Sequence, residues 1–251
     1  MKPATSNQMN CLLAGNSFGF LAKIPYLCPK NKPNIMETIN FNDCSLGGLE
    51  DKFALQPQRT LSSLTNWLAT NSSLIDAHQI VLKQLTQILS DNAAHWNEQD
   101  LSMHFIGPMF SLVGFTERSR FNLFAQSSLT GIVDGVTLTG RVDELIASGF
   151  RIPKVPFFAF NEYKKEMEYK GDPAGQALAA MLVGQSLNDN TKPIYGCYVI
   201  GSIWRFMTLE AKRYAISKSY DGTDFEDACQ ILRILFQLKE YCMERTQAPA
   251  E

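Results

Sequence analysis

Apolar side chains recur every three or four positions in several stretches of the chain, which is the repeat that lines one face of an α-helix. Pro108 lies inside one stretch and predicts a kink, because proline lacks an amide hydrogen and its ring clashes with the preceding turn. Thr223 or Asp224 can cap the last stretch. The expected helices, the first of them a short helix or turn, cover residues 46–55, 60–68, 72–90, 98–113, 173–184 and 225–241.

Runs rich in Thr, Val, Ile and aromatic residues lie between these helices and predict strands. Gly135 and Gly140 mark the joints near which two of the strands meet. The expected strands start at Phe121, cover 129–136, 136–147, 194–201, 203–209 and 214–217, and include one run that ends at Lys164. This order predicts an α/β fold, in which helices flank a mixed β-sheet and further helices precede it.

The chain divides into an extension and a single domain. Residues 1–45 mix Pro, Asn, Gly and Lys without a sustained period, so we expect a loosely held N-terminal extension there. Residues 46–251 contain no internal repeat or low-complexity linker, and they predict one domain with a helical N-terminal part.

Composition narrows the class of protein. Apolar residues make up 45% and charged residues 19% of the 251 residues, which is typical of a globular chain. The net charge of −2 neither favours nor excludes a nucleic-acid partner. The six cysteines lack the spacing of a zinc site and predict reduced thiols in a cytoplasmic protein. No run reaches the roughly eighteen apolar residues of a membrane span, and polar residues interrupt the apolar stretch 11–28, so we expect neither a span nor a secretion signal.

The triplet Glu162-Tyr163-Lys164 closes an apolar run and is the first candidate for chemistry. Alternation along a strand places Glu162 and Lys164 on one face, with Phe158 and Phe160 before them, and points Tyr163 away. A carboxylate and an ammonium at the edge of a core need partners, because burying an unpaired charge is costly. A divalent cation would satisfy carboxylates gathered at such a place.

Asp143 together with the Glu162-x-Lys164 motif resembles the PD-(D/E)XK nuclease superfamily, although Val142 stands where that family has its proline. The resemblance implies a restriction-endonuclease-like fold in which Asp143 and Glu162 hold Mg²⁺, with Mn²⁺ as an alternative, and Lys164 orients the attacking water. Strand, helix and strand follow Glu162 and Lys164 in the order of the superfamily core.

Two further residues enter through the resemblance. The stretch NEQDLSMHFIGPMFSLVGF is similar to the helix that begins the N-terminal nuclease domain of type I restriction subunits, which implies that Glu98 joins the metal site. Equally, Glu98 could simply complement the helix dipole. Gln176 begins the helix after Glu162-x-Lys164, where related nucleases have a glutamine that points back at the site; a plain surface glutamine is the alternative.

Two other acids compete with Asp143. We favour Asp143 because it precedes Leu145-Ile146-Ala147 and a glycine turn, one hairpin away from the Glu162 strand. Glu144 should lie on the opposite face, in a solvated or salt-bridged role. Asp134 remains the second choice.

The resulting hypothesis is a nuclease that hydrolyses phosphodiester bonds, with DNA expected over RNA and with restriction or another defence role as its setting. A homodimer is an alternative to a monomer, because cutting both strands often needs two sites. The rival hypotheses are an inactive nucleic-acid-binding or protein-interaction module on the same fold, and a surface ion-pair cluster on an unrelated α/β protein. Basic side chains that could contact phosphates are Arg118, Arg120, Lys165, Lys170, Lys212 and Arg213.

Overall fold

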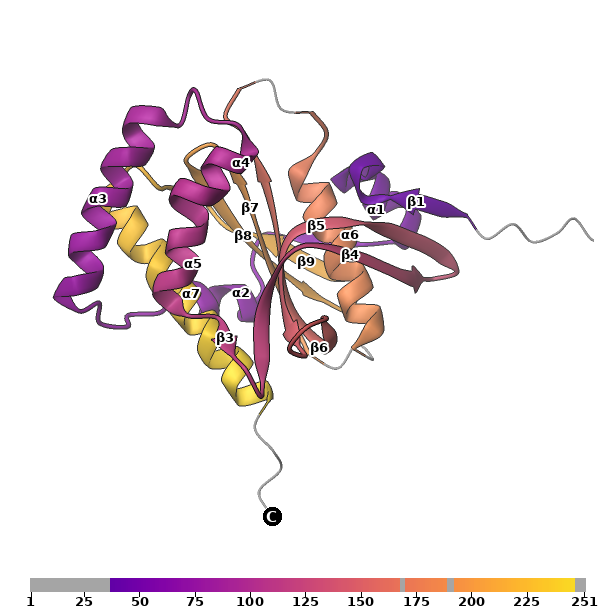
Figure 1. Ribbon diagram of the computed structural model, residues 1–251. Coiled ribbons are helices and arrows are strands. Elements are labelled where there is room, and N and C mark those ends of the chain that lie inside the picture. Colours follow the sequence, from indigo (N-terminus) through magenta and orange to yellow (C-terminus); the bar gives the residue numbers. More distant parts are fainter. Residues whose placement is uncertain (1–36, 168–169, 189–191, 247–251) are drawn as a thin grey trace, which may run out of the picture. The chain divides into compact units, whose positions relative to one another are not determined.

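A mixed sheet of ten strands runs through the part of the chain that this computed structural model describes, residues 37–167, 170–188 and 192–246 (Figure 1). Its strands are β1 (Thr38–Asn40), β2 (Gln56–Gln58), β3 (Thr116–Glu117), β4 (Phe121–Val133), β5 (Val136–Ser148), β6 (Lys154–Lys164), β7 (Ile194–Ile200), β8 (Ile203–Glu210), β9 (Arg213–Ile216) and β10 (Tyr220–Asp221). Their order is β2-β9-β8-β7-β6-β5-β4-β3, while β1 pairs with β5 and β10 with β8. The β6–β7, β2–β9 and β1–β5 pairs are parallel and the others are antiparallel.

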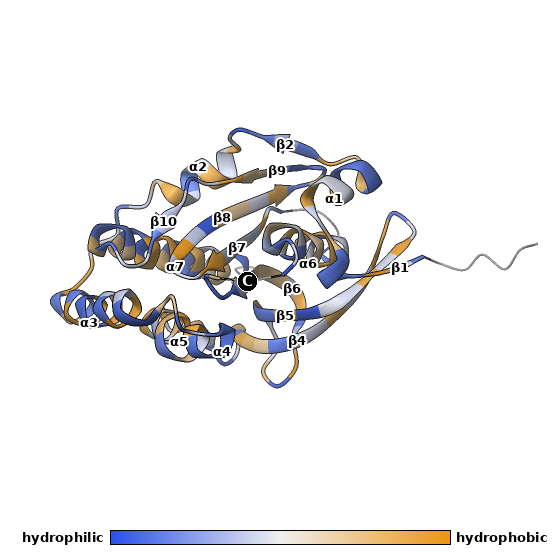
Figure 2. Ribbon diagram, turned by 90° about the horizontal axis from the view of Figure 1, so that it is seen from above, coloured by the Kyte–Doolittle hydropathy of each residue, from blue (hydrophilic) through white to orange (hydrophobic). Residues whose placement is uncertain are grey.

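Helices cover both faces of this sheet (Figure 2). They are α1 (Leu46–Phe53), α2 (Ser62–Leu68), α3 (Asp76–Asn92), α4 (Glu98–Leu101), α5 (Gly107–Val113), α6 (Pro173–Leu187) and α7 (Phe225–Arg245). One apolar core lies between the sheet and α2, α3, α5 and α7, and a second lies between the other face and α1 and α6. The predicted mixed sheet flanked by helices is therefore confirmed.

Helix α6 connects the parallel strands β6 and β7 and is apolar on all sides, because other elements enclose it. Its first turn packs closely against the segment before α1. A Cβ atom on Gly175 would lie 2.6 Å from the Cα of Ser45, so only glycine allows this approach. The close packing fixes the position of the neighbouring Gln176, which is 4% exposed.

Strands β4 and β5 form one long hairpin. Asp134 and Gly135 make its turn, and their positive φ angles of 48° and 81° are those of a type I′ turn. The predicted joint near Gly135 is thus confirmed. Gly140 is not a joint but an interior residue of β5, where the ring of Phe41 packs on its backbone and a Cβ atom would lie 2.5 Å from that ring.

The end of the expected extension belongs to the sheet. Residues 38–40 form β1, which pairs in parallel with β5, and the following 3₁₀ turn, Phe41–Asp43, buries Phe41. A three-residue strand carries too few side chains to show a period, which is why the sequence did not reveal it. Residues 1–36 of the expected extension lie outside the described residues.

The helix predicted around Pro108 is disturbed, as expected. A π-helical segment, Ser102–Ile106, separates α4 from α5, and the amide of Gly107 donates to the carbonyl of Ser102. The wider turn leaves room next to a residue that cannot donate to the helix ladder.

Neither a membrane-spanning helix nor a cysteine bridge occurs in the described parts of the chain. No helix there has the length and apolar character needed to cross a membrane. Cys44, Cys197, Cys229 and Cys242 are free and buried, as predicted for reduced thiols.

Candidate active site

Asp143 and Glu162 lie on neighbouring antiparallel strands, β5 and β6. The register pairs Glu144 with Asn161, so one further step places Asp143 opposite Glu162 on the same face. Carboxylates directly opposite each other on a sheet repel. Glu162 is 7% exposed, so solvent screens this repulsion poorly.

A bulge in β6 changes which aromatic residues share that face. The register between β5 and β6 shifts at Ala147, and Phe158 packs against Phe121 on the α7 side of the sheet. Phe160 stacks on Phe157 on the α6 side. The prediction that Phe158 shares a face with Phe160 is therefore wrong, because the extra residue of the bulge turns Phe158 to the other core.

Lys164 and Glu98 complete the surroundings of Glu162. The Nζ of Lys164 lies 2.5 Å from Oε1 of Glu162, and Oε1 of Glu98 accepts a hydrogen bond of 3.4 Å from the backbone amide of Lys165. The pKa of Glu162 is raised from 4.5 to about 7, by burial first and then by the charges of Asp143 and Glu98, against the opposing effect of Lys164. The structure therefore brings together the four charged residues that the sequence singled out.

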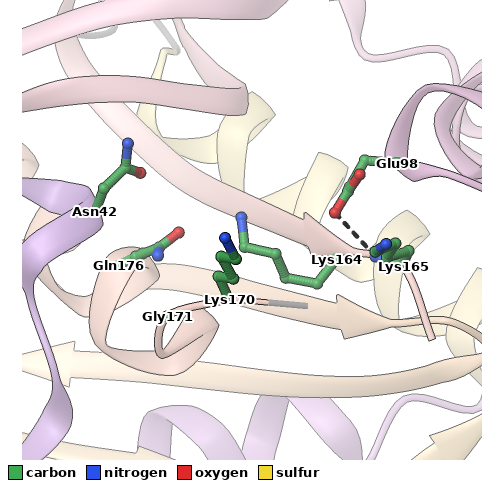
Figure 3. A pocket seen from close by; sticks show the side chains of 7 residues that line it. All are labelled: Asn42, Glu98, Lys164, Lys165, Lys170, Gly171 and Gln176. Atoms are coloured by element: carbon green, nitrogen blue, oxygen red, sulfur yellow. Dashed lines mark hydrogen bonds between the residues drawn. The ribbon is translucent and has the colours of Figure 1, made fainter. Parts of the chain in front are cut away.

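A cavity of about 490 Å³ opens beside Lys164 (Figure 3). Its lining residues are Asn42, Glu98, Lys164, Lys165, Lys170, Gly171 and Gln176. In Figure 3, Glu98 and Lys165 lie at one end, Asn42 and Gln176 at the other, and Lys164 and Lys170 between them. Asp143 and Glu162 are not among these lining residues, and Glu162 is connected with the cavity through its ion pair with Lys164.

Gln176 is a buried part of this cavity and not a surface glutamine. Its carboxamide oxygen is buried without a hydrogen-bond partner among the described residues. Gly171 makes room for the side chain: a Cβ atom there would lie 2.6 Å from Nε2 of Gln176. A buried amide oxygen without a donor is costly, so this position favours an incoming donor.

The carboxylates do not form a preassembled metal cluster. In residues 37–167, 170–188 and 192–246, no group of three or more His, Cys, Asp or Glu is arranged to hold a metal ion. Both oxygens of Asp143 accept hydrogen bonds, one of 2.8 Å from Nε2 of Gln126 and one of 2.7 Å from the amide of Tyr163. Asp143, Glu162 and Glu98 still supply the hard oxygen donors that Mg²⁺ prefers, and a cation between opposed carboxylates would relieve their repulsion, so the residue types fit such an ion.

The two competing acids have other surroundings. Asp134 sits in the exposed hairpin turn and pairs with Lys212, so it does not join the site. Glu144 lies on the opposite face, as predicted, but it is neither solvated nor salt-bridged. It is 5% exposed and accepts a hydrogen bond of 2.5 Å from the hydroxyl of Tyr163. The pKa of Glu144 is raised to about 7, by burial first and also by the charge of Asp143, against the opposing hydrogen bond from the Tyr163 hydroxyl.

Among the basic residues proposed as phosphate contacts, Lys165 and Lys170 line the cavity. The other four interact with other groups. They are Arg118, over the ring of Phe150; Arg120, bonded to Met243 and Thr246 at the end of α7; Lys212, paired with Asp134; and Arg213, paired with Glu210.

Sequence reasoning missed Asn42 and Gln126. Asn42 comes from the segment expected to be loosely held, and no motif marks it. Gln126 lies opposite Asp143 in the β4–β5 register and has a positive φ of 50°, which is uncommon for a residue other than glycine. The strand register places Gln126 next to Asp143, and the sequence alone does not show this register.

No protein-family model and no curated protein matches the chain. The fold and the site define the protein as a mixed α/β protein that carries a cluster of carboxylates and a lysine where the central strand β6 ends.

Proposed function

We propose that this protein is a magnesium-dependent nuclease of the PD-(D/E)XK kind, which hydrolyses phosphodiester bonds in DNA. The observation that carries the proposal is the buried carboxyl of Glu162, which faces Asp143, pairs with Lys164 and feels the charge of Glu98. Perturbed titratable groups that gather beside a cavity are typical of catalytic sites. The order of β6, α6 and β7 after Asp143 supports the restriction-endonuclease-like topology.

Each residue has a distinct role in this proposal. Asp143 and Glu162 hold the metal ion, with Glu98 as a direct or water-mediated contributor. When bound, Mg²⁺ neutralises charge on the phosphate oxygens, which otherwise repel the nucleophile; Mn²⁺ is an alternative. Lys164 orients the attacking water, and the buried oxygen of Gln176 accepts a hydrogen bond from a group in the cavity.

The lysines of the cavity support a nucleic-acid substrate. Lys164, Lys165 and Lys170 place positive charge at its lining, and a phosphate chain would meet them next to the carboxylates. Because the chain carries a net charge of −2, binding depends on this local group of lysines. The proposal includes a preference for DNA over RNA and a homodimer that cuts both strands. It also includes a cytoplasmic location and a role in defence.

A cleavage assay on single-stranded and double-stranded DNA and RNA tests this function, with Mg²⁺, with Mn²⁺ and with a chelator. We expect metal-dependent cleavage, which K164A reduces about a hundredfold or more. The matched control is K154A, because Lys154 is an exposed lysine at the other end of β6. The variant D143N is tested in the same assay, with D134N as its matched control. Cleavage that persists in K164A, or that survives the chelator, would contradict the proposal.

A non-cleaving nucleic-acid-binding module is the second candidate. The observation that favours it is the state of Asp143, whose two oxygens already accept hydrogen bonds. For this module we expect metal-independent DNA binding that K165A and K170A weaken, with no cleavage under any condition of the assay.

A further inference from the structure

Tyr163, the middle residue of the Glu162-x-Lys164 motif, is bound at two points to two consecutive acids of β5. Its hydroxyl donates to Oε2 of Glu144 over 2.5 Å, and its backbone amide donates to Oδ2 of Asp143 over 2.7 Å. The two acids lie on opposite faces of the sheet. Tyr163 therefore connects the cavity face with the buried face at the point where β6 ends.

These contacts lie where the backbone ladder between β5 and β6 stops. The paired register runs from Ser148 with Lys154 to Glu144 with Asn161. Beyond it, the side chains of Asp143 and Glu144 bind the β5-facing edge of the end of β6, while the other edge stays paired with β7 through Lys164. A hydrogen bond to a carboxylate is stronger and shorter than one between neutral groups, so this link restricts the strand end effectively.

The buried side of the link is costly to build. Glu144, Asn161, Tyr163 and Cys197 lie within the apolar core under α5 and α7, and Sγ of Cys197 donates to Oδ1 of Asn161 over 3.1 Å. The amide nitrogen of Asn161 is buried without a partner among the described residues. A core of apolar side chains alone would avoid these desolvation costs. A positioning role gives a reason for the polar group.

We propose that Glu144 is a positioning residue: by accepting the Tyr163 hydroxyl it fixes the end of β6, so that Glu162 and Lys164 face Asp143. This inference rests on the proposed nuclease function for its catalytic consequence, while the placement of the strand end can be measured without any activity. Glu144 itself does not reach the cavity, whose lining comes from other residues.

The variants Y163F, E144L and E144Q separate the hydrogen bond from packing and charge. Phenylalanine keeps the ring and removes the donor; leucine removes the acceptor; glutamine keeps an acceptor oxygen without the charge. Y220F is the matched control, because Tyr220 is a buried tyrosine of the same apolar core on β10.

Hydrogen exchange measured by NMR is the first readout. The reporters are the amides of Tyr163 and Lys165, which donate to Asp143 and Glu98. The amide of Phe206 on β8, which donates to Oγ of Ser217, reports global opening. We expect Y163F and E144L to speed exchange of the two reporters about tenfold or more relative to Phe206, as the loss of a hydrogen bond to a charged group implies. E144Q keeps a neutral acceptor oxygen and should speed exchange less than E144L does, while Y220F should leave the ratio unchanged.

Cleavage kinetics are the second readout. Y163F should lower kcat about tenfold per folded molecule and raise the half-saturating Mg²⁺ concentration, while KM for DNA stays the same. Unchanged reporter exchange in Y163F, or equal effects of E144Q and E144L, would overturn the positioning role even in an active enzyme. A wild-type protein that never cleaves would instead overturn the nuclease function, and the exchange data would still decide the role of Glu144.

Discussion

Replacing Glu162 by glutamine should stabilise the protein at alkaline pH. Glu162 is 7% exposed, and its pKa is raised from 4.5 to about 7 by burial first, then by the charge of Asp143. The folded state therefore holds its proton more tightly than the unfolded state does. The stability from this group is fully present below pH 4.5 and is lost as the pH rises through about 7.

The size of the loss follows from the two pKa values. Each pKa unit corresponds to 1.36 kcal/mol, so the rise from 4.5 to about 7 costs about 3 kcal/mol of unfolding free energy once Glu162 is ionised. E162Q removes this cost and keeps an amide oxygen that can accept from Lys164. The pKa of about 7 already includes the opposing effect of Lys164, so we expect a net gain of about 1 to 3 kcal/mol at pH 8 and less than about 1 kcal/mol at pH 5. This corresponds to a rise in Tm of roughly 2 to 10 °C.

Urea unfolding and thermal melting of the wild type and E162Q, both in chelator, at pH 5 and pH 8, measure this gain. D134N is the control, since Asp134 forms a surface ion pair with Lys212 worth about 0 to 1 kcal/mol. Added Mg²⁺ at pH 8 should then stabilise the wild type more than E162Q. If E162Q were no more stable than the wild type at pH 8, the raised pKa of Glu162 would be refuted, and with it the cost assigned to its burial and to the charge of Asp143.

Two further predictions concern the fold. G140A should lower the unfolding free energy by about 1 to 3 kcal/mol, because the new Cβ atom would lie 2.5 Å from the ring of Phe41. G47A is the control: Gly47 lies in α1 with open space around it, so alanine there should raise the unfolding free energy by up to about 1 kcal/mol. Equal shifts of the two variants in urea unfolding would contradict this contrast. W67F should cost about 1 to 3 kcal/mol in the same assay, because it leaves the carbonyl of Ile234 without the Trp67 indole hydrogen bond of 2.9 Å, and an unchanged midpoint would show that this bond does not contribute.

The long periodic elements could be predicted from the sequence, because burial of one face leaves a repeat of apolar positions. The helix from Phe225 and the strand that ends at Lys164 are such cases. The order of the helices and strands along the chain predicted the mixed sheet. The two-residue and three-residue strands carry too few positions for a repeat, and their place in the sheet depends on partners far along the chain.

The candidate site was predictable as a set of residues and not as a geometry. Alternation along β6 gave the shared face of Glu162 and Lys164, but the bulge that moves Phe158 to the other core leaves no local signal. The burial of Glu144 was missed for a similar reason. A single glutamate in a strand is usually solvated, whereas this one is buried beside Tyr163, a residue of the apolar core.

Both faces of the β5–β6 pair carry a buried glutamate, but the groups around the two glutamates differ. This difference indicates on which face a ligand would bind. Glu144 is buried on one face and has a neutral donor, the Tyr163 hydroxyl, at 2.5 Å. On the other face the charges of Asp143 and Glu98 help to raise the pKa of the buried Glu162, and Lys164 is the cation that pairs with it. The cavity face thus has more negative charge around Glu162 than Lys164 alone offsets, and it opens to solvent where the buried face does not. A divalent cation entering from the cavity would lower the pKa of Glu162, which is why the pH dependence of stability and its response to Mg²⁺ test the same electrostatic imbalance.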